Sequence, residues 1–155
     1  KTTHGPPNLW DVSKITDMST LFKGTEFNEP IGDWNTSKVV NMEGMFEGAT
    51  SFNQPIGKWR TQDVKNMAGM FEGATSFNQP IGKWRTENVE TMARMFRRAT
   101  SFNQSLVEWS MESVKSNTGM FGPYEGVMPR SNYPSNHEFE YLQIKLTQEL
   151  RQMYH

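Results

Sequence analysis

The chain has 155 residues, enough for one domain of ordinary size, and its lack of cysteine excludes disulfides, thiolate metal sites and a cysteine nucleophile. Sixteen lysines and arginines nearly balance seventeen aspartates and glutamates, and the net charge of -1 gives no overall attraction to nucleic acid or anionic lipid. No apolar run approaches the ~20 residues of a membrane-spanning helix, so we expect no membrane span.

A repeat is visible from the tryptophans, which recur at intervals of 24, 25, 25 and 25 residues. They are Trp10, Trp34, Trp59, Trp84 and Trp109. A fixed interval of this length indicates one supersecondary unit, copied along the chain and stacked so that neighbouring copies bury a common core. We place an N-terminal extension at residues 1–9 and about five repeats of 24–25 residues at 10–122.

Within each copy the periodicity changes. From Met67 to Ala74 the apolar residues fall at i, i+3, i+4 and i+7, which predicts a short helix. Gly73 is placed to end this helix, although Arg98 breaks the pattern in the fourth copy. Residues 56–59 are better strand candidates. We therefore predict an α/β repeat solenoid, a leucine-rich-repeat-like, right-handed stack of short parallel strands and short helices.

Equivalent residues of successive copies form columns. We expect four apolar columns to build the core: Phe22, Phe46, Phe71, Phe96 and Phe121; Phe27, Phe52, Phe77 and Phe102; Ile31, Ile56, Ile81 and Leu106; and Ile15, Val39, Val64, Val89 and Val114. A polar column consists of Asn28, Asn53, Asn78 and Asn103. We expect these amides to hydrogen-bond to the turn backbone and to the next copy, because buried main-chain groups need partners, rather than to hold a ligand.

The repeat, written W-x-x-S-x-V-x-x-M-x-x-M-F-x-G-A-x-S-F-N-Q-P-I-G, resembles the BspA-like surface-protein repeats, also known as mycoplasma-lipoprotein-type repeats of unknown function. The segments WDVSKITDMSTLF and WNTSKVVNMEGMFEGATSFNQPIG, which begin at Trp10 and Trp34, carry the resemblance, which covers roughly residues 9–122. It implies a leucine-rich-repeat-like fold, occurrence on microbial surfaces and in marine microalgae, and roles in adhesion or protein binding. It supplies no catalytic residues.

The C-terminal part departs from the repeat. Residues 123–134 are a proline-rich connection, and residues 135–155 predict an amphipathic helix that begins with Ser135 and Glu138 at the spacing of a capping box. Its apolar stripe includes Phe139, Leu142, Leu146 and Leu150. We expect this helix to cap the open end of the stack. The alternative is that its stripe docks onto a partner.

Basic residues flank two of the tryptophans as K-W-R, so a stack would align Lys58 with Lys83 and Arg60 with Arg85. This surface is either an ordinary mixture of solvated charges or a footprint for an acidic partner. The candidate partner-binding residues are therefore Lys58, Arg60, Lys83, Arg85, Tyr124, Tyr133, Phe139, Leu142, Leu146 and Leu150.

No motif indicates catalysis, a cofactor or a metal. The three histidines lie in the tails without ligand spacing, and no glycine loop suited to phosphate is present. We therefore expect a non-enzymatic module for protein–protein interaction or adhesion, at the cell surface or secreted, that binds protein and not nucleic acid. The alternative is a structural accessory subunit of a large complex, including an organellar membrane complex, contacted through the C-terminal segment.

Overall fold

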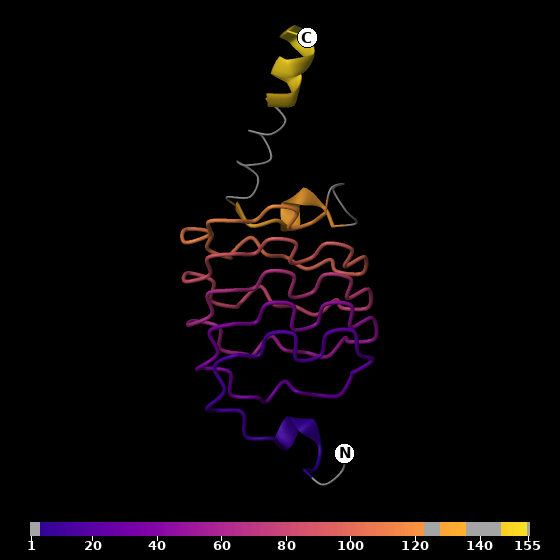
Figure 1. Cartoon of the computed structure of the whole chain (residues 1–155), viewed down its shortest axis with the longest axis vertical. Coiled ribbons are helices and arrows are strands. Elements are labelled where there is room, and N and C mark those ends of the chain that lie inside the picture. Colours follow the sequence, from indigo (N-terminus) through magenta and orange to yellow (C-terminus); the bar gives the residue numbers. More distant parts are fainter. Residues whose placement is uncertain (1–3, 123–127, 136–146, 155) are drawn as a thin grey trace.

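The computed structural model describes residues 4–122, 128–135 and 147–154. The chain winds through layers that lie one above another, from the N-terminal end in indigo to the last layer in orange (Figure 1). Each layer is one repeat, and we call these layers coils 1 to 5, beginning at Trp10, Trp34, Trp59, Trp84 and Trp109. The regular elements of the described residues are the 3-10 helices η1 (Pro7–Leu9) and η2 (Arg130–Asn132) and the helical residues 147–154.

The predicted α/β solenoid is wrong for the described residues. The β-type pairing between successive coils consists of isolated parallel bridges, and such single bridges do not make a strand. The bridges join Asp17 to Asn41, Asn41 to Asn66, Asn66 to Thr91 and Thr91 to Ser116. The expected helix over 67–74 is a series of turns, because the N–H of Phe71 donates to Met95 of the next coil at 2.9 Å instead of to a carbonyl four residues back. The described coils are therefore neither strands nor helices, and the leucine-rich-repeat-like expectation fails with them.

Glycines in left-handed conformation explain why the turns replace a helix. Gly69 and Gly73 have φ angles of 62° and 71°, which right-handed helices do not contain. In this segment, every second main-chain N–H group therefore points toward the next coil. The donors Met67, Gly69, Phe71 and Gly73 of coil 3 bond to Thr91, Ala93, Met95 and Arg97 of coil 4 at 2.8–3.0 Å.

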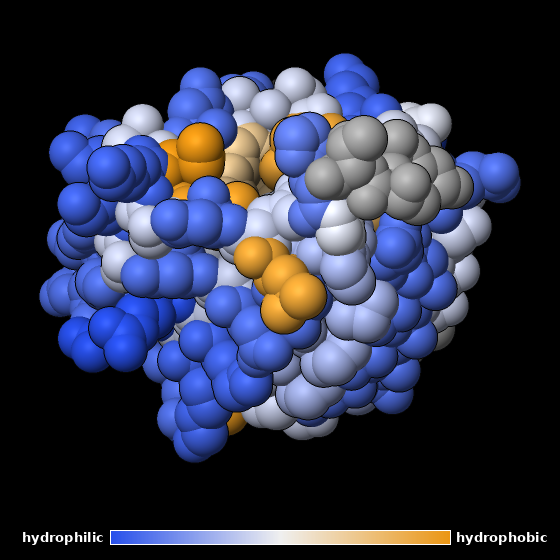
Figure 2. Space-filling view, turned by 90° about the horizontal axis from the view of Figure 1, so that it is seen from below, coloured by the Kyte–Doolittle hydropathy of each residue, from blue (hydrophilic) through white to orange (hydrophobic). Residues whose placement is uncertain are grey.

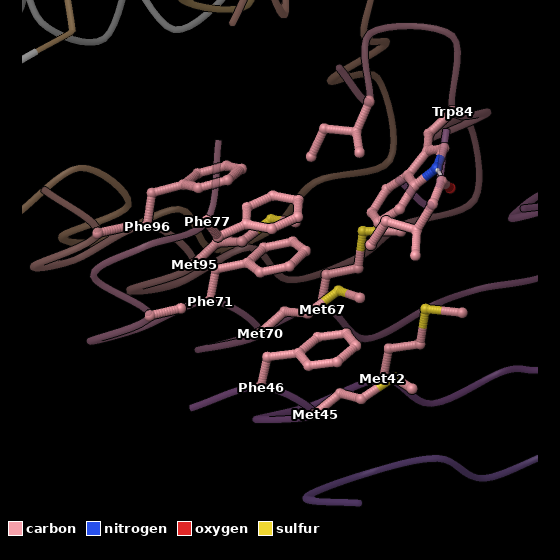
Figure 3. Packing of buried hydrophobic residues seen from close by; sticks show 14 of the residues in the cluster. Met42, Met45, Phe46, Met67, Met70, Phe71, Phe77, Trp84, Met95 and Phe96 are labelled. Carbon is pink, nitrogen blue, oxygen red and sulfur yellow. Dashed lines mark hydrogen bonds between the residues drawn. The ribbon is translucent and has the colours of Figure 1, made fainter. Parts of the chain in front are cut away.

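Aromatic rings form the core between coils. Phe46, Phe71 and Phe96 lie face to face at centroid distances of 5.6 and 5.7 Å, with methionines beside them (Figure 3). The tryptophans stack in the same way, Trp59 on Trp84 at 6.2 Å, and all but Trp10 are buried. The predicted apolar columns are thus confirmed in coils 2 to 4. At the two ends of the stack Ile15 is exposed, and the side chains that are only partly buried include Phe22, Phe27, Val114 and Phe121.

The asparagine column joins the coils, as predicted. The side-chain oxygen of each asparagine accepts the main-chain N–H of the asparagine one coil later, with distances of 2.9 Å for Asn28 to Asn53, 2.9 Å for Asn53 to Asn78 and 2.8 Å for Asn78 to Asn103. The side-chain amides of three glutamines donate to the asparagine of the coil before: Gln54 to Asn28, Gln79 to Asn53 and Gln104 to Asn78. These amides therefore satisfy backbone groups within the stack.

The C-terminal end of the stack is covered by residues 128–135, which we call the cap. Asn132 extends the asparagine column by the contact that the glutamines make, because its side-chain amide donates to Asn103 at 3.0 Å while its carbonyl accepts the N–H of Leu106 at 2.8 Å. The buried ring of Tyr133 stacks on Phe121 at 4.1 Å. The described residues that cover this end belong mostly to the predicted connection, and Ser135 of the expected capping helix donates to the carbonyl of Val107 at 3.1 Å. Residues 136–146 of that helix lie outside the described residues. In the described part of that helix, residues 147–154 are exposed.

Candidate functional site

Three of the four basic residues that flank Trp59 and Trp84, which we call the K-W-R residues, form ion pairs. Lys58 and Lys83 lie at equivalent places in coils 2 and 3, but Lys58 reaches down to Asp33 at 3.1 Å and Lys83 reaches up to Glu108 at 3.3 Å. Arg85 pairs with Glu87 of its own coil. Among the described residues Arg60 has no ion-pair partner. Exposed pairs of this kind contribute little to stability, but they neutralise the surface that an acidic partner would need.

Glu108 is the residue that the sequence analysis missed here. It stands at the position of Lys58 and Lys83 one repeat later, so the column Asp33, Lys58, Lys83, Glu108 can be read from the sequence once every copy is aligned. Beside it lies a shallow hollow of about 270 Å³ whose lining includes Lys83, Arg85, Glu87 and Glu108. Its charges balance, which suits a solvated mixed surface better than a footprint for an acidic partner.

The pKa of the Asp33 carboxyl lies below its ordinary value because Lys58, and then Asn8, donate hydrogen bonds to it. A lowered folded-state pKa means that the contribution of Asp33 to stability is present above its ordinary pKa and is lost as the pH falls through the folded value. We expect Lys58→Ala to raise the pKa of Asp33, measured by NMR titration of its carboxyl carbon. Lys83→Ala is the matched control, and a similar rise in that variant would contradict the pairing.

Three arginines of coil 4 cluster on a different edge of the stack. Arg94 and Arg98 take the places of Gly69 and Gly73 and keep their left-handed conformation, with φ angles of 57° and 61°. Such a conformation costs a non-glycine residue roughly 1–2 kcal/mol. Arg94 and Arg97 approach the same carboxylate, that of Glu72, at 3.4 and 3.9 Å. This edge thus carries one acidic and three basic groups within two coils.

The C-terminal candidates separate into buried, exposed and undescribed residues. Tyr133 is buried in the cap and serves the stack. Leu150 is exposed, as are Met153 and Tyr154 on the same short helix. The remaining candidates lie outside the described residues: Tyr124, Phe139, Leu142 and Leu146. Of the described candidates, Tyr133 packs against Phe121 of coil 5.

The N-terminal end of the stack was not among the candidates, yet it carries apolar surface. Trp10, Ile15 and Leu21 are exposed, whereas their equivalents in the middle coils are buried, and Leu9 of η1 is exposed as well. Seen from below, orange side chains interrupt the polar surface of this end (Figure 2). The sequence does hold a signal, because the first copy that it contains carries apolar residues at core positions.

In the part of the chain that the structure describes, no three His, Cys, Asp or Glu side chains gather in a way that could hold a metal ion. None of the helices described there is long and apolar enough to cross a membrane.

Comparison with known proteins gives one match. The sequence fits the family described as "Mycoplasma protein of unknown function, DUF285" over residues 2–84 and again over residues 25–130. The two matches overlap, as expected when a repeated unit can be aligned in more than one register. No curated protein and no solved structure was found to match the chain.

Proposed function

Because the chain belongs to this DUF285 family, whose function is unknown, we propose from its surface that it is a non-enzymatic module for protein–protein interaction. The observation that carries the proposal is where apolar surface remains. Among the described residues, seven of the nine exposed large apolar side chains lie at the two ends of the chain: Leu9, Trp10, Ile15, Leu21, Leu150, Met153 and Tyr154. Apolar side chains exposed together favour binding to another protein.

The coils act as a rigid spacer in this proposal. Their phenylalanines, methionines and tryptophans stack on one another, and their asparagines bond to the next coil, so the sides of coils 2 to 4 retain mainly polar and ion-paired groups. Placement on a microbial surface or in a secreted protein, with adhesion as the role, rests on the resemblance to BspA-like repeats. It is proposed on that basis alone.

The partner site that we propose is the face of residues 147–154 that bears Leu150 and Met153. These side chains are three residues apart, so they share one face of the helix, and both are more than half exposed. A short amphipathic helix inserted into an apolar groove is a common mode of protein recognition.

Paired substitutions test this site. We expect Leu150→Glu with Met153→Glu to weaken binding to the partner captured from the native source at least about tenfold, since anchor residues of an interface contribute more than 1 kcal/mol. The matched control, Gln148→Glu with Gln152→Glu, adds the same two charges to other exposed positions of the helix. Equal affinities for the two double variants would contradict the proposal, whether the affinities fall together or stay unchanged.

A second candidate is an accessory subunit of a large complex, including an organellar membrane complex. The same exposed helix favours it, because a segment that extends beyond the last coil can reach into an assembly (Figure 1). The two functions differ in location and size. Labelling of the protein on intact cells by a membrane-impermeant reagent supports the surface module, whereas comigration with a large complex after mild solubilisation supports the accessory subunit.

A further inference from the structure

In one segment of each coil, the main-chain hydrogen bonds to the next coil all run in the same direction. In the segment of coil 2 that contains Met42 and Phe46, alternate N–H groups donate to the coil above, Met42 to Asn66 at 2.9 Å and Phe46 to Met70 at 2.9 Å. The carbonyls on the other edge of the segment, including Met45, accept from the coil below. A β-strand presents both donors and acceptors along each edge. This segment has a donor edge and an acceptor edge instead.

Coil 1 has its acceptor edge open. The carbonyls of Asp17, Leu21 and Lys23 are equivalent to those of Asn41, Met45 and Glu47, which accept from Met18, Phe22 and Gly24. Within the described chain, no donor bonds to these three carbonyls of coil 1. The fourth, that of Ser19, accepts only from the hydroxyl of the adjacent Thr20. Four acceptors thus stand at alternate residues along one edge.

Apolar surface borders these acceptors. Trp10, Ile15 and Leu21 are each about two-fifths to one-half exposed, and the rings of Phe22 and Phe27 are only partly buried. A hollow of about 400 Å³ adjoins them, lined by His4, Leu9, Trp10 and Asp11. The exposed apolar residues belong to the columns that bury their equivalents between coils. The end of coil 1 therefore repeats the surface on which each coil packs, without its neighbour.

We propose that this open end binds one further coil of the same repeat type, presented with its donor edge toward coil 1. The proposal extends the interface that already joins coil 1 to coil 2, and it concerns the opposite end of the chain from residues 147–154. It therefore goes beyond the function proposed above and does not depend on it.

The direction of the hydrogen bonds excludes two other occupants. A second copy cannot pair its own open end with this one over these residues, since acceptors would face acceptors. Its other end is covered by the cap, where Asn132 and Tyr133 occupy coil positions. A β-strand would place its own carbonyls against those of coil 1 at part of the contacts. Only a segment whose N–H groups all face one way fits the whole edge, and left-handed residues such as Gly44 and Gly48 give the repeat that property.

A synthetic peptide with the sequence of residues 34–58 tests the inference on the full chain. We expect saturable binding, with NMR shift changes at the main-chain groups of Asp17, Leu21 and Lys23. N-methylation of the peptide at Met42, Gly44 and Phe46 removes the donors and should weaken binding at least about tenfold. N-methylation at Gln54, whose N–H makes no main-chain bond between coils in the described structure, is the control.

A second variant pair locates the site on the chain. Leu21→Glu should weaken peptide binding at least about tenfold, while Val107→Glu, at a similarly exposed residue of coil 4, should leave it unchanged. The inference is overturned if no saturable shift appears at about 1 mM peptide, a weak affinity for any specific complex. It is also overturned if the methylated positions do not matter, or if the chain alone dimerises through coil 1 in sedimentation equilibrium. The effect of Leu150→Glu on partner binding tests the proposed function and not this inference.

Discussion

Replacement of Phe71 by alanine is expected to lower the free energy of unfolding by about 3–5 kcal/mol, the range for phenylalanine-to-alanine changes in a core. The side chain is fully buried and its ring faces Phe46 and Phe96 at 5.6 and 5.7 Å and Phe77 at 4.1 Å. Its loss leaves a cavity that the stacked rings cannot close, because the coil spacing is held by main-chain hydrogen bonds on both sides. Urea denaturation at 25 °C measures the change.

Phe22→Ala is the matched control, since Phe22 occupies the same column in coil 1 but is packed on one side only. We expect a clearly smaller loss for this variant, because its side chain is already partly exposed and its removal creates less enclosed volume. Equal losses for the two variants would mean that burial between two coils does not determine the energy of the column. A loss near 5 kcal/mol is comparable to the whole stability of many domains.

The core could be predicted because residues one repeat apart in the sequence lie one coil apart in the structure. Once the tryptophans give the interval, residues such as Phe46, Phe71 and Phe96 must lie above one another, whatever the backbone between them does. The same translation places Asn53 beside Asn28 and Asn78. The burial of the phenylalanine column and the hydrogen bonds of the asparagine column could therefore be predicted without knowledge of the secondary structure.

The secondary structure could not be predicted from the same pattern. Apolar residues at Met67, Met70 and Phe71 fit one face of a helix, and they fit equally a turning segment that points them inward. The difference lies in the glycines. We took Gly73 as the end of a helix, whereas Gly69 and Gly73 are left-handed residues inside the segment that direct its N–H groups to the next coil. Arg98, which broke the helical pattern, adopts that same conformation.

The ends of the stack were the least predictable parts. Tyr133 and Asn132 lie off the period, so nothing in their spacing revealed that Tyr133 stacks as a phenylalanine of the columns does and that Asn132 bonds to Asn103 as a glutamine does. Their roles depend on a loop folding back to a surface that only the three-dimensional stack provides. Likewise, the ion pairs of Lys58 and Lys83 point in opposite directions along the stack, which follows from the charges at the ends of their column.

Gly57→Ala is expected to destabilise the chain by about 1–3 kcal/mol or more, the cost of overpacking a filled interior. A Cβ on Gly57 would lie 2.7 Å from the carbonyl oxygen of Pro80 in the next coil, and Gly32 and Gly82 meet carbonyls of their neighbours at the same distance. The obstacle is backbone, so relief requires the coils to move apart, and that motion stretches the bonds of the asparagine and tryptophan columns. Thermal and urea unfolding measure the loss.

Val107→Ala controls for a change of side chain at the same position of the repeat. Val107 follows Gly32, Gly57 and Gly82 by the repeat interval, but it lies under the cap and is partly exposed, so a side chain is accommodated there. We expect this variant to stay within about 0.5 kcal/mol of the wild type, as exposed substitutions usually do. If Gly57→Ala changed the free energy of unfolding as little as Val107→Ala, the prediction would be contradicted. The coils would then not be held at the spacing at which a methyl group on Gly57 meets the next coil.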